Sequence, residues 1–347
     1  MTTIVGWDIG GVNVKASWLV WERGAVKTMR VSSCPFEIWR AKDSLPEALQ
    51  TVLAQVSDEL PRVMAVTMTA ELSDVFVTKR EGVLYVADTL LATFPHCAAY
   101  ALDLSGRFAA LAEARTRPLD FAAANWLATA LFIARSYPNC LLIDVGSTTT
   151  DIIPIVDGQV ACRGRTDMDR LMSGELVYTG AVRTHLASIV HAVPVRGRLC
   201  PVSSEYFAVS GDVHLILGQL RAEDYAFPTP DGRPPTIESA RQRLARLVCA
   251  DAEMLGAAEI DELARSIYQQ QLAQISAALL QVRSRFADRA DWPVVAMGSG
   301  AFMAVEAGRR LGLTVLDLAA QWGREASAVA PCVAVAQLLA EQIEARS

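Results

Sequence analysis

Short apolar strands that end in glycine turns open the chain and return near its middle. Residues 3–8 are apolar and β-favouring, a glycine turn follows at 9–11, and residues 12–21 resume the strand pattern. The same arrangement recurs over residues 139–144, 145–147 and 148–156. Helical spacing of apolar residues predicts helices at 43–59, 120–135, 237–255, 259–285, 301–311 and 332–345, and further strands at 25–31, 62–68, 293–297 and 314–316.

Strands that alternate with helices around two separate hairpins predict an α/β protein with two lobes and a central cleft. We expect residues 1–122 together with 330–347 to form the N-terminal lobe, and residues 123–329 to form the C-terminal lobe. The apolar helix at 120–135 would cross between them. The C-terminal helix is expected to be exposed, which would allow a homodimer.

Composition narrows the class of function. Of the 347 residues 52% are hydrophobic and 20% are charged, a balance typical of a folded protein. The net charge of -6 argues against binding to nucleic acid or to a membrane surface, because no basic excess exists to neutralise phosphates. We see no signal peptide or spanning segment, and the seven cysteines are dispersed. A cytoplasmic enzyme with reduced thiols is therefore expected, and zinc is not.

The first glycine turn carries candidate phosphate chemistry. Gly10 and Gly11 let the backbone present N–H donors to an anion, and Asn13 begins the polar face of the next strand. Asp8, at the end of the strand, can bind Mg²⁺ or its waters. Lys15 is placed to reach a phosphate as a point charge. An ordinary hairpin turn with a surface lysine is the competing interpretation.

The same pattern of strand, aspartate and glycine turn occurs a second time, which makes an ordinary hairpin a weaker interpretation. Asp144 ends an apolar strand, Gly146 lies in the turn, and Ser147, Thr148 and Thr149 open the following strand. If each lobe supplies one such loop, a phosphate group would sit between them.

A third glycine turn follows the strand at 293–297. Gly298 and Gly300 stand where this strand runs into a helix, a position that also favours anions. We therefore count both glycines as candidate phosphate-binding residues.

The order of these three turns resembles the superfamily of acetate kinase, sugar kinases, heat-shock chaperones and actin. A narrower resemblance covers nearly the whole chain, to the hydantoinase/oxoprolinase-like proteins of tetrahydromethanopterin-linked one-carbon transfer, which include the coupling enzymes of methanofuran biosynthesis. The stretches that carry it are residues 69–76 (TAELSDVF), 79–83 (KREGV), 123–126 (AANW), 146–154 (GSTTTDIIP), 164–167 (GRTD), 174–180 (GELVYTG) and 229–233 (TPDGR).

That resemblance implies an actin-like (ribonuclease-H-like) fold and a transferase reaction. A phenol oxygen of tyramine, tyrosine or a glutamylated form would displace diphosphate from an aminomethylfuran-methyl diphosphate. We expect Asp8 and Asp144 to hold Mg²⁺, the turn residues to cradle the diphosphate, and Lys15 to bind this leaving group. ATP is not expected to be required, and the partners are small molecules only.

The resemblance also suggests residues for the organic parts of the substrates. Glu71 and Asp74 follow a strand, and one would be the base while the other holds the ammonium group of the furan; a helix cap is the alternative for Glu71. The remaining candidates for substrate binding are Lys79, Arg165, Asp167, Tyr178 and Arg183. Arg165, Arg170 and Arg183 are the candidates for binding carboxylates of the acceptor, with a solvated or ion-paired arginine as the alternative for each.

Other functions stay open on the sequence. The main alternative is an ATP-dependent small-molecule kinase that binds adenosine near residues 298–302, although Phe302 and Met303 would crowd an adenine there. A hydantoinase or oxoprolinase activity is suggested only by the family's name. A non-catalytic actin-like scaffold would bind nucleotide without turnover.

Overall fold

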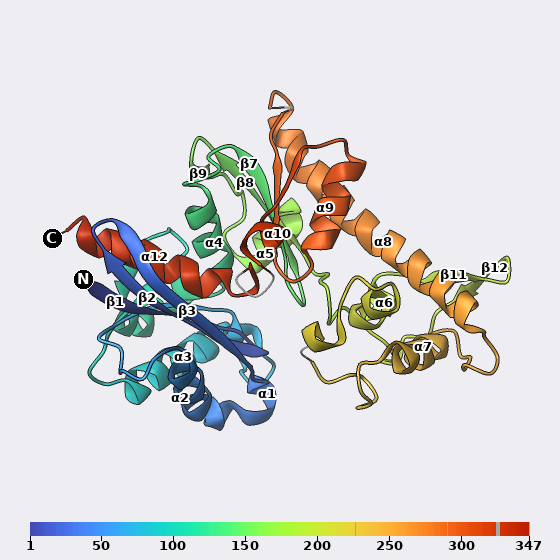
Figure 1. Ribbon diagram of the computed structural model, residues 1–347, viewed down its shortest axis with the longest axis horizontal. Helices are drawn as coiled ribbons and strands as arrows, with labels where there is room; N and C mark the ends of the chain where they lie inside the picture. The colour runs from blue at the N-terminus through green and yellow to red at the C-terminus, as the bar shows by residue number, and fades with distance from the viewer. Residues whose placement is uncertain (226, 290, 324–326, 347) are drawn as a thin grey trace.

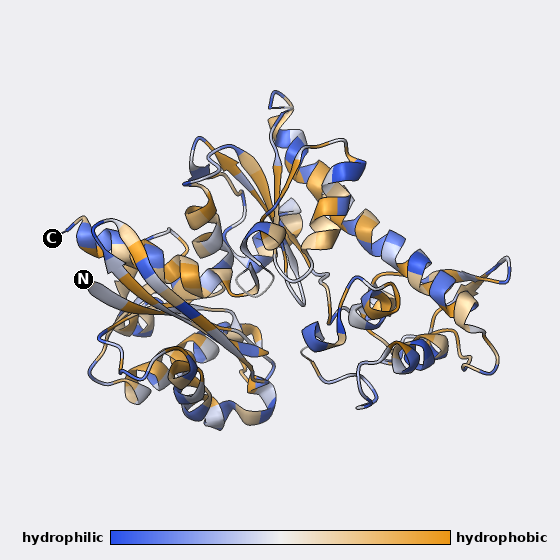
Figure 2. Cartoon of the chain, in the orientation of Figure 1, coloured by the Kyte–Doolittle hydropathy of each residue, from blue (hydrophilic) through white to orange (hydrophobic). Residues whose placement is uncertain are grey.

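The computed structural model describes residues 1–225, 227–289, 291–323 and 327–346. Over these ranges the chain forms two α/β lobes and a mainly helical insertion, and both chain ends lie beside the N-terminal lobe (Figure 1). Apolar residues concentrate in the strands of both sheets (Figure 2). None of the helices in these ranges has the length and apolar character needed to cross a membrane.

The N-terminal lobe is built on a six-stranded sheet in the order β3-β2-β1-β4-β5-β6. β1, β4 and β5 run parallel, and the other neighbours are antiparallel. The strands are β1 (Thr2–Ile9), β2 (Asn13–Glu22), β3 (Ala25–Pro35), β4 (Val63–Met68), β5 (Ala98–Leu102) and β6 (Phe108–Ala110). One face packs on α1 (Ile38–Ala41), α2 (Leu45–Val56) and α3 (Lys79–Thr93) through a continuous apolar cluster.

The C-terminal helix α12 (Ala330–Glu344) covers the other face of this sheet, together with α4 (Asn125–Ile133). It approaches β1 so closely that a Cβ on Gly6 would stand 1.9 Å from the carbonyl oxygen of Cys332, which only glycine permits. Ser17 Oγ donates a hydrogen bond of 2.9 Å to the same oxygen. The expectation of an exposed helix at 332–345 is therefore wrong, because the apolar side of α12 belongs to the core.

The C-terminal lobe repeats the plan with the order β10-β8-β7-β13-β14, and β9 pairs with β8. The strands are β7 (Cys140–Val145), β8 (Thr150–Val156), β9 (Gln159–Val160), β10 (Leu176–Val177), β13 (Val294–Met297) and β14 (Val315–Asp317). α8 (Ala257–Arg283) and α9 (Ala301–Arg310) pack on one face, while α4 and α10 (Leu318–Trp322) pack on the other. The short helix α5 (Asp167–Ser173) precedes β10.

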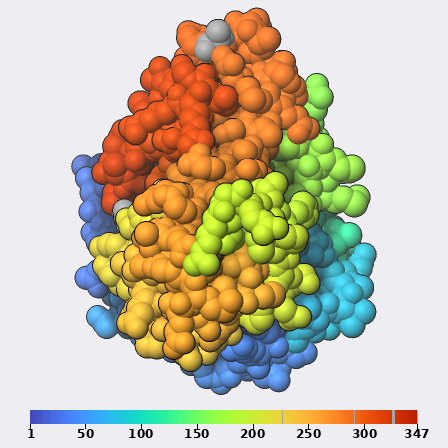
Figure 3. All heavy atoms as spheres, turned by 90° about the vertical axis from the view of Figure 1, so that its right-hand side faces the viewer, coloured from blue at the N-terminus to red at the C-terminus, as the bar shows by residue number. Residues whose placement is uncertain are grey.

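An insertion between β10 and α8 holds the β11–β12 hairpin (Ala192–Val195 and Arg198–Pro201), α6 (Ser210–Ile216) and α7 (Ile237–Arg246). Its apolar residues join the core around α8. Figure 3 shows the β11–β12 hairpin lying across the outer face of this insertion and the end of α8. The short 3-10 turns are η1 (Lys42–Ser44), η2 (Ala70–Leu72), η3 (Leu111–Arg115), η4 (Pro118–Phe121), η5 (Leu186–Ser188), η6 (Ala222–Asp224) and η7 (Ser284–Phe286).

Two sheets of matching topology confirm the expected α/β fold of the actin-like, ribonuclease-H-like class. The exact lobe boundaries at residues 122 and 330 stay predictions. Two predicted helices need correction, and one helix was missed. The helix expected at 120–135 is broken at Ala123, whose φ of 49° is left-handed, and the one expected at 237–255 ends at Arg246, just before Cys249 at φ 56°. The sequence patterns did not predict α3.

Candidate active site

The first hairpin joins β1 to β2 and carries an ion pair at its base. The Gly10 N–H donates to the Asn13 carbonyl at 2.9 Å, which closes the turn. Asp8 lies directly opposite Lys15 in the strand register, and Lys15 Nζ stands 3.2 Å from Asp8 Oδ2. Asp8 is 2% exposed, and its other oxygen, Oδ1, is buried without a hydrogen-bond partner among the described residues.

The second hairpin, between β7 and β8, has the same backbone geometry. The Gly146 N–H donates to the Thr149 carbonyl at 2.9 Å, the same spacing from the preceding aspartate as in the first hairpin. Asp144 occupies the position of Asp8, and the residue opposite it in the register is Asp151. The second loop therefore repeats the turn of the first but replaces its lysine with a carboxylate.

Both turns direct their carbonyls into the fold. The carbonyls of Gly11 and Val12 accept hydrogen bonds from the N–H groups of Ile38 and Phe36, at 3.1 and 2.9 Å. Those of Gly146 and Ser147 accept from residues 181–183 at 2.9 to 3.0 Å. The N–H groups of Gly11, Val12, Ser147, Thr148 and Thr149 make no hydrogen bond to the described part of the chain. Such free N–H donors are what an anion cradle requires.

Charges on the two hairpins influence one another. Burial alone would lower the pKa of Lys15, but the negative charges of Asp8 and Asp144 raise it above its ordinary value. Burial raises the pKa of Asp144 to about 7, and Asp151 and Asp8 add to the shift while Lys15 opposes it. The two hairpins thus form one electrostatic unit between the lobes, although they come from opposite halves of the chain.

Asp151 is tied into the C-terminal lobe by a buried arginine. Arg170 Nη2 lies 2.8 Å from Asp151 Oδ1, and the guanidinium stacks on Trp126 with 4.0 Å to the ring centroid. Burial raises the pKa of Asp151, with Arg170 opposing the shift. Arg170 is 1% exposed, and its Nη2 also donates to the Glu175 carbonyl at 3.0 Å. Because the guanidinium lies inside the lobe and already pairs with Asp151, the structure does not support the expectation that Arg170 binds an acceptor carboxylate.

Glu71 is a buried acid outside the two hairpins, packed against Gly82 of α3. It lies in η2 after β4 and is 1% exposed, and neither carboxylate oxygen accepts a well-formed hydrogen bond. Burial raises the pKa of Glu71 to about 7, offset in part by backbone N–H groups and Lys79. An acid with a pKa near neutrality can take up a proton at physiological pH. The carboxylate of Glu71 does not cap a helix, which was the alternative interpretation of this residue.

An ion pair joins the lobes next to Glu71. Lys79, at the start of α3, lies 2.8 Å from Asp167, at the start of α5. Both side chains are partly exposed, at 32% and 21%. The structure thus joins these two predicted substrate-binding residues to each other.

The other predicted residues divide into two groups. Asp74, Arg165 and Tyr178 are exposed, and the side chains of Asp74 and Arg165 make no hydrogen bond or ion pair with the described residues. Arg183 is partly buried, and its Nη1 lies 3.4 Å from Thr148 Oγ1 in the second turn. Thr148 Oγ1 also lies 3.4 Å from Ser147 Oγ, so two hydroxyls stand together at this turn.

The third glycine turn plays a packing role. The Gly298 N–H donates to Ser327 Oγ and the Gly300 N–H to the Val145 carbonyl, both at 2.8 Å. A Cβ on Gly298, at φ 89°, would stand 2.3 Å from Asp144 Oδ1. The N–H groups of Gly298 and Gly300 therefore already donate hydrogen bonds within the protein and are not available to a phosphate. The turn instead packs against Asp144.

Three residues of this site were not singled out as candidates from the sequence. Asp151 could have been found by aligning the two hairpins, because it takes the position of Lys15. The rings of Trp39 and Phe227 both contact Arg183, with 5.3 and 4.6 Å from the guanidinium carbon to the ring centroids. No local pattern marks these two, since each comes from a different part of the chain.

The carboxylates suit a magnesium ion that is shared with a substrate. Asp8 has a buried oxygen without a partner, and Asp144 is held at a raised pKa among other acids. Among the described residues no cluster of three or more metal-binding side chains occurs. Two carboxylates, completed by water and substrate phosphates, are a set that Mg²⁺ accepts.

Comparisons with known proteins agree on the family. The family model "Hydantoinase/oxoprolinase" matches residues 62–342. A protein of Methanocaldococcus jannaschii named (4-{4-[2-(gamma-L-glutamylamino)ethyl]phenoxymethyl}furan-2-yl)methanamine synthase is 36% identical over 342 residues, which cover 98% of both chains. A protein of Methanococcus vannielii with the same name is 32% identical over 60% of this chain and 94% of its own.

Among solved structures, nucleotide-free acetone carboxylase superposes with a TM-score of 0.55 over 96% of this chain and 70% of its own. At 12% identity this likeness concerns the fold alone. The sequence relatives go further, because the matched region includes both lobes and the aligned length is nearly complete. The chain therefore belongs to the hydantoinase/oxoprolinase family, together with these two archaeal synthases.

Proposed function

We propose that this chain is a transferase that joins an aminomethylfuran-methyl diphosphate to the phenol of a tyramine, tyrosine or glutamylated acceptor, with release of diphosphate. Two relatives bear the name of a synthase whose product contains a furan, a phenoxymethyl ether and a glutamylated amine. The observation that carries the proposal is the pair of matched turns, whose free N–H groups adjoin Asp8, Lys15 and Asp144.

The proposed reaction breaks the bond between the furfuryl carbon and the diphosphate oxygen. The electron pair leaves with the diphosphate, and the N–H groups of Gly11, Val12, Ser147 and Thr148 with Lys15 stabilise its growing charge. The phenol oxygen forms the new ether bond to the same carbon. Positive charge on that carbon is spread by the furan oxygen, so the carbon–diphosphate bond can break early.

Glu71 is proposed as the base that accepts the phenol proton. A phenol has a pKa of about 10, so a nearby carboxylate assists its attack at neutral pH. Asp74, which is exposed, then has the other assignment, holding the ammonium group of the furan. The proton ends on Glu71 and then passes to solvent.

We propose Asp8 and Asp144 as the residues that hold Mg²⁺. The bound ion would supply positive charge to the diphosphate oxygens. No nucleotide enters the balance of this reaction, so we propose that ATP is not required. The substrates are small molecules in the cytoplasm.

The test is a direct assay of the purified protein. Furfuryl diphosphate carrying the aminomethyl group is incubated with glutamyl-tyramine and Mg²⁺, without ATP. Diphosphate is quantified, and the aryl ether is identified by its mass. We expect equal amounts of both products. Hydrolysis of ATP in the presence of small alcohols, with no ether formed, would instead favour the kinase alternative.

A further inference from the structure

Arg183 is fixed to the second hairpin by its own backbone. Its N–H donates to the Ser147 carbonyl at 2.9 Å, and its side chain turns back so that Nη1 lies 3.4 Å from Thr148 Oγ1. An anion held by the N–H groups of this turn is therefore within reach of the guanidinium.

The fold neutralises its other deeply placed arginines but not this one. Arg170 pairs with Asp151 at 2.8 Å, Arg243 with Asp212 at 2.7 Å, and Arg285 with Glu175 at 2.8 Å. Arg183 makes no ion pair with any described residue. Glu37, an acid whose charge reaches it, is already paired with Arg40 at 2.8 Å.

Desolvation without a partner is costly for a guanidinium. Burial lowers the pKa of Arg183, and the neighbouring tyrosines and Glu37 offset the shift only in part. A partly buried cation that has no carboxylate partner is therefore a candidate for binding an anionic ligand.

Aromatic rings from both lobes hold the guanidinium in place. Trp39 comes from α1 of the N-terminal lobe, and Phe227 comes from the insertion loop. A guanidinium stacked in this way keeps its N–H edge available for an oxyanion. The rings thus orient Arg183 without neutralising it.

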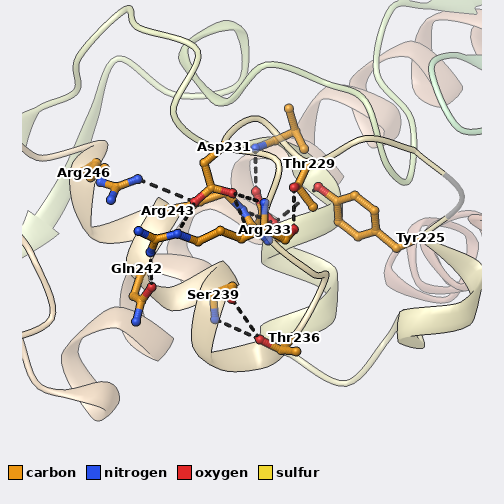
Figure 4. Close-up of polar contacts among 11 residues, drawn as sticks. Tyr225, Thr229, Asp231, Arg233, Thr236, Ser239, Gln242, Arg243 and Arg246 are labelled. Carbon is orange, nitrogen blue, oxygen red and sulfur yellow. Dashed lines mark hydrogen bonds and ion pairs between the residues drawn. The ribbon is translucent and has the colours of Figure 1, made fainter. Parts of the chain in front are cut away.

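The loop that carries Phe227 is itself anchored by buried charges. Arg243 bonds Asp212 and, at 3.0 Å, Asp231, and Asp231 also accepts from the Arg233 N–H (Figure 4). Thr229 Oγ1 donates to the Arg233 carbonyl at 2.6 Å, which closes the loop. On the other side of Phe227, the Tyr225 hydroxyl donates to Asp212 at 3.3 Å. Thr229 and Asp231 of the 229–233 stretch therefore have a structural role in shaping this loop.

We infer that Arg183 binds the departing diphosphate, as the C-terminal lobe's counterpart of Lys15. The inference rests on the proposed function for the identity of the anion. It replaces the earlier expectation that Arg183 holds a carboxylate of the acceptor. The fork of the guanidinium suits a carboxylate and a phosphate equally, so the assignment rests on position: Nη1 lies 3.4 Å from Thr148 Oγ1, in the turn that is proposed to hold the diphosphate.

Calorimetric titration with inorganic diphosphate and Mg²⁺ tests this without any turnover. We expect Arg183→Gln to weaken binding about 10- to 100-fold, the loss of a charge-assisted hydrogen bond, and Arg183→Lys to restore part of it. Arg198→Gln, an exposed residue on β12, changes the net charge equally and should leave binding unchanged. Thermal melts of each variant show that the fold is retained.

A second readout separates the two roles of Arg183. The KM values for tyramine and for glutamyl-tyramine should change by the same factor in Arg183→Gln. If a folded Arg183→Gln or Arg183→Lys protein binds diphosphate like the wild type, or loses only its preference for the carboxylated acceptor, the inference fails. A wild-type chain that binds diphosphate through Arg183 but releases none from furfuryl diphosphate would support the inference and overturn only the proposed reaction.

Discussion

The two hairpins share one backbone and differ in one charge. Both close with an N–H to carbonyl bond of 2.9 Å between equivalent residues, and in both the N–H groups at the tip of the turn make no hydrogen bond to the described residues. Opposite its aspartate, the first hairpin has Lys15, whereas the second has Asp151. The N-terminal hairpin therefore contains a balanced ion pair, while the C-terminal one concentrates acids.

This difference separates two tasks that one anion site needs. The N-terminal hairpin offers a cation to the diphosphate, and the C-terminal hairpin stores negative charge that a metal ion can neutralise. The effect of this repulsion is seen in the pKa of Asp144, which burial and its acidic neighbours raise to about 7. A duplicated loop can thus bind one ligand with unlike halves.

Replacing each aspartate by asparagine should reveal the difference most strongly. We expect both Asp8→Asn and Asp144→Asn to lose about 10³-fold or more of the turnover rate, since either change removes a proposed Mg²⁺ ligand. Their stabilities should move in opposite directions, by about 1–3 kcal/mol. Asp8→Asn leaves Lys15 without its partner, while Asp144→Asn relieves repulsion from Asp151.

Rates at saturating Mg²⁺ and urea unfolding curves of the two variants measure both effects. Asp88→Asn, at an exposed acid on α3, serves as the charge control. Near-normal turnover by Asp8→Asn would remove the metal role proposed for this residue. Equal shifts in stability would show that the two hairpins do not differ in charge balance.

Much of this site could be predicted from the sequence because the hairpins are local. Apolar strands, an aspartate and glycine turns occur within eight residues in each case, so short-range physics fixes them. Pairing between distant segments leaves no such mark. The contact of Arg183 with Trp39 and Phe227, and the return of α12 to β1, depend on the packing of whole lobes.

The errors follow the same logic. Gly298 and Gly300 have the pattern of an anion-binding turn, but only the structure shows that their N–H groups bond Ser327 and Val145. Likewise an apolar face on α12 cannot by itself distinguish a core helix from an exposed one. The local sequence predicts the geometry of a turn but not which groups of the folded protein pack against it.

Glu71 lies outside the two hairpins and provides a separate test, of the proposed base. If it is the base, Glu71→Gln should lower the rate about 10²-fold or more at pH 8 and abolish the rise in rate that is expected as pH increases through about 7. The folded-state pKa lies above the ordinary 4.5, so the protonated form favours folding. The resulting stability is complete below pH 4.5 and is lost as pH rises through about 7.

Glutamine mimics the protonated acid at every pH. Glu71→Gln should therefore be more stable than the wild type at pH 8, by a few kcal/mol at most, and nearly equal to it at pH 4.5. Rate profiles and unfolding curves across this range test both statements. An unchanged pH–rate profile would assign the proton transfer to another group, and Glu81→Gln, an exposed acid in α3, is the control.

Alanine substitutions should have different effects at Gly180, which packs against the second turn, and at Gly11, which lies within the first. A Cβ on Gly180 would stand 2.6 Å from the backbone of Thr148, so Gly180→Ala must displace the second turn. We expect it to destabilise the protein by about 1–3 kcal/mol and to weaken diphosphate binding. Thermal melting and calorimetry measure these losses. A stable Gly180→Ala protein with unchanged affinity would show that the turn shifts freely.

The smallest effect is expected in the first turn. A Cβ on Gly11 would meet no atom within 4 Å, so Gly11→Ala should keep the melting temperature of the wild type. If this open space is where a phosphate rests against the free N–H groups, the added methyl group should still weaken diphosphate binding, by about tenfold, because the oxygens can no longer approach as closely. Titration with diphosphate checks this, with Gly158→Ala as a control for substitution at an open turn; that control has a φ of 76° and should lose stability but no affinity. Unchanged binding by Gly11→Ala would mean that the anion lies nearer the second hairpin, next to Arg183.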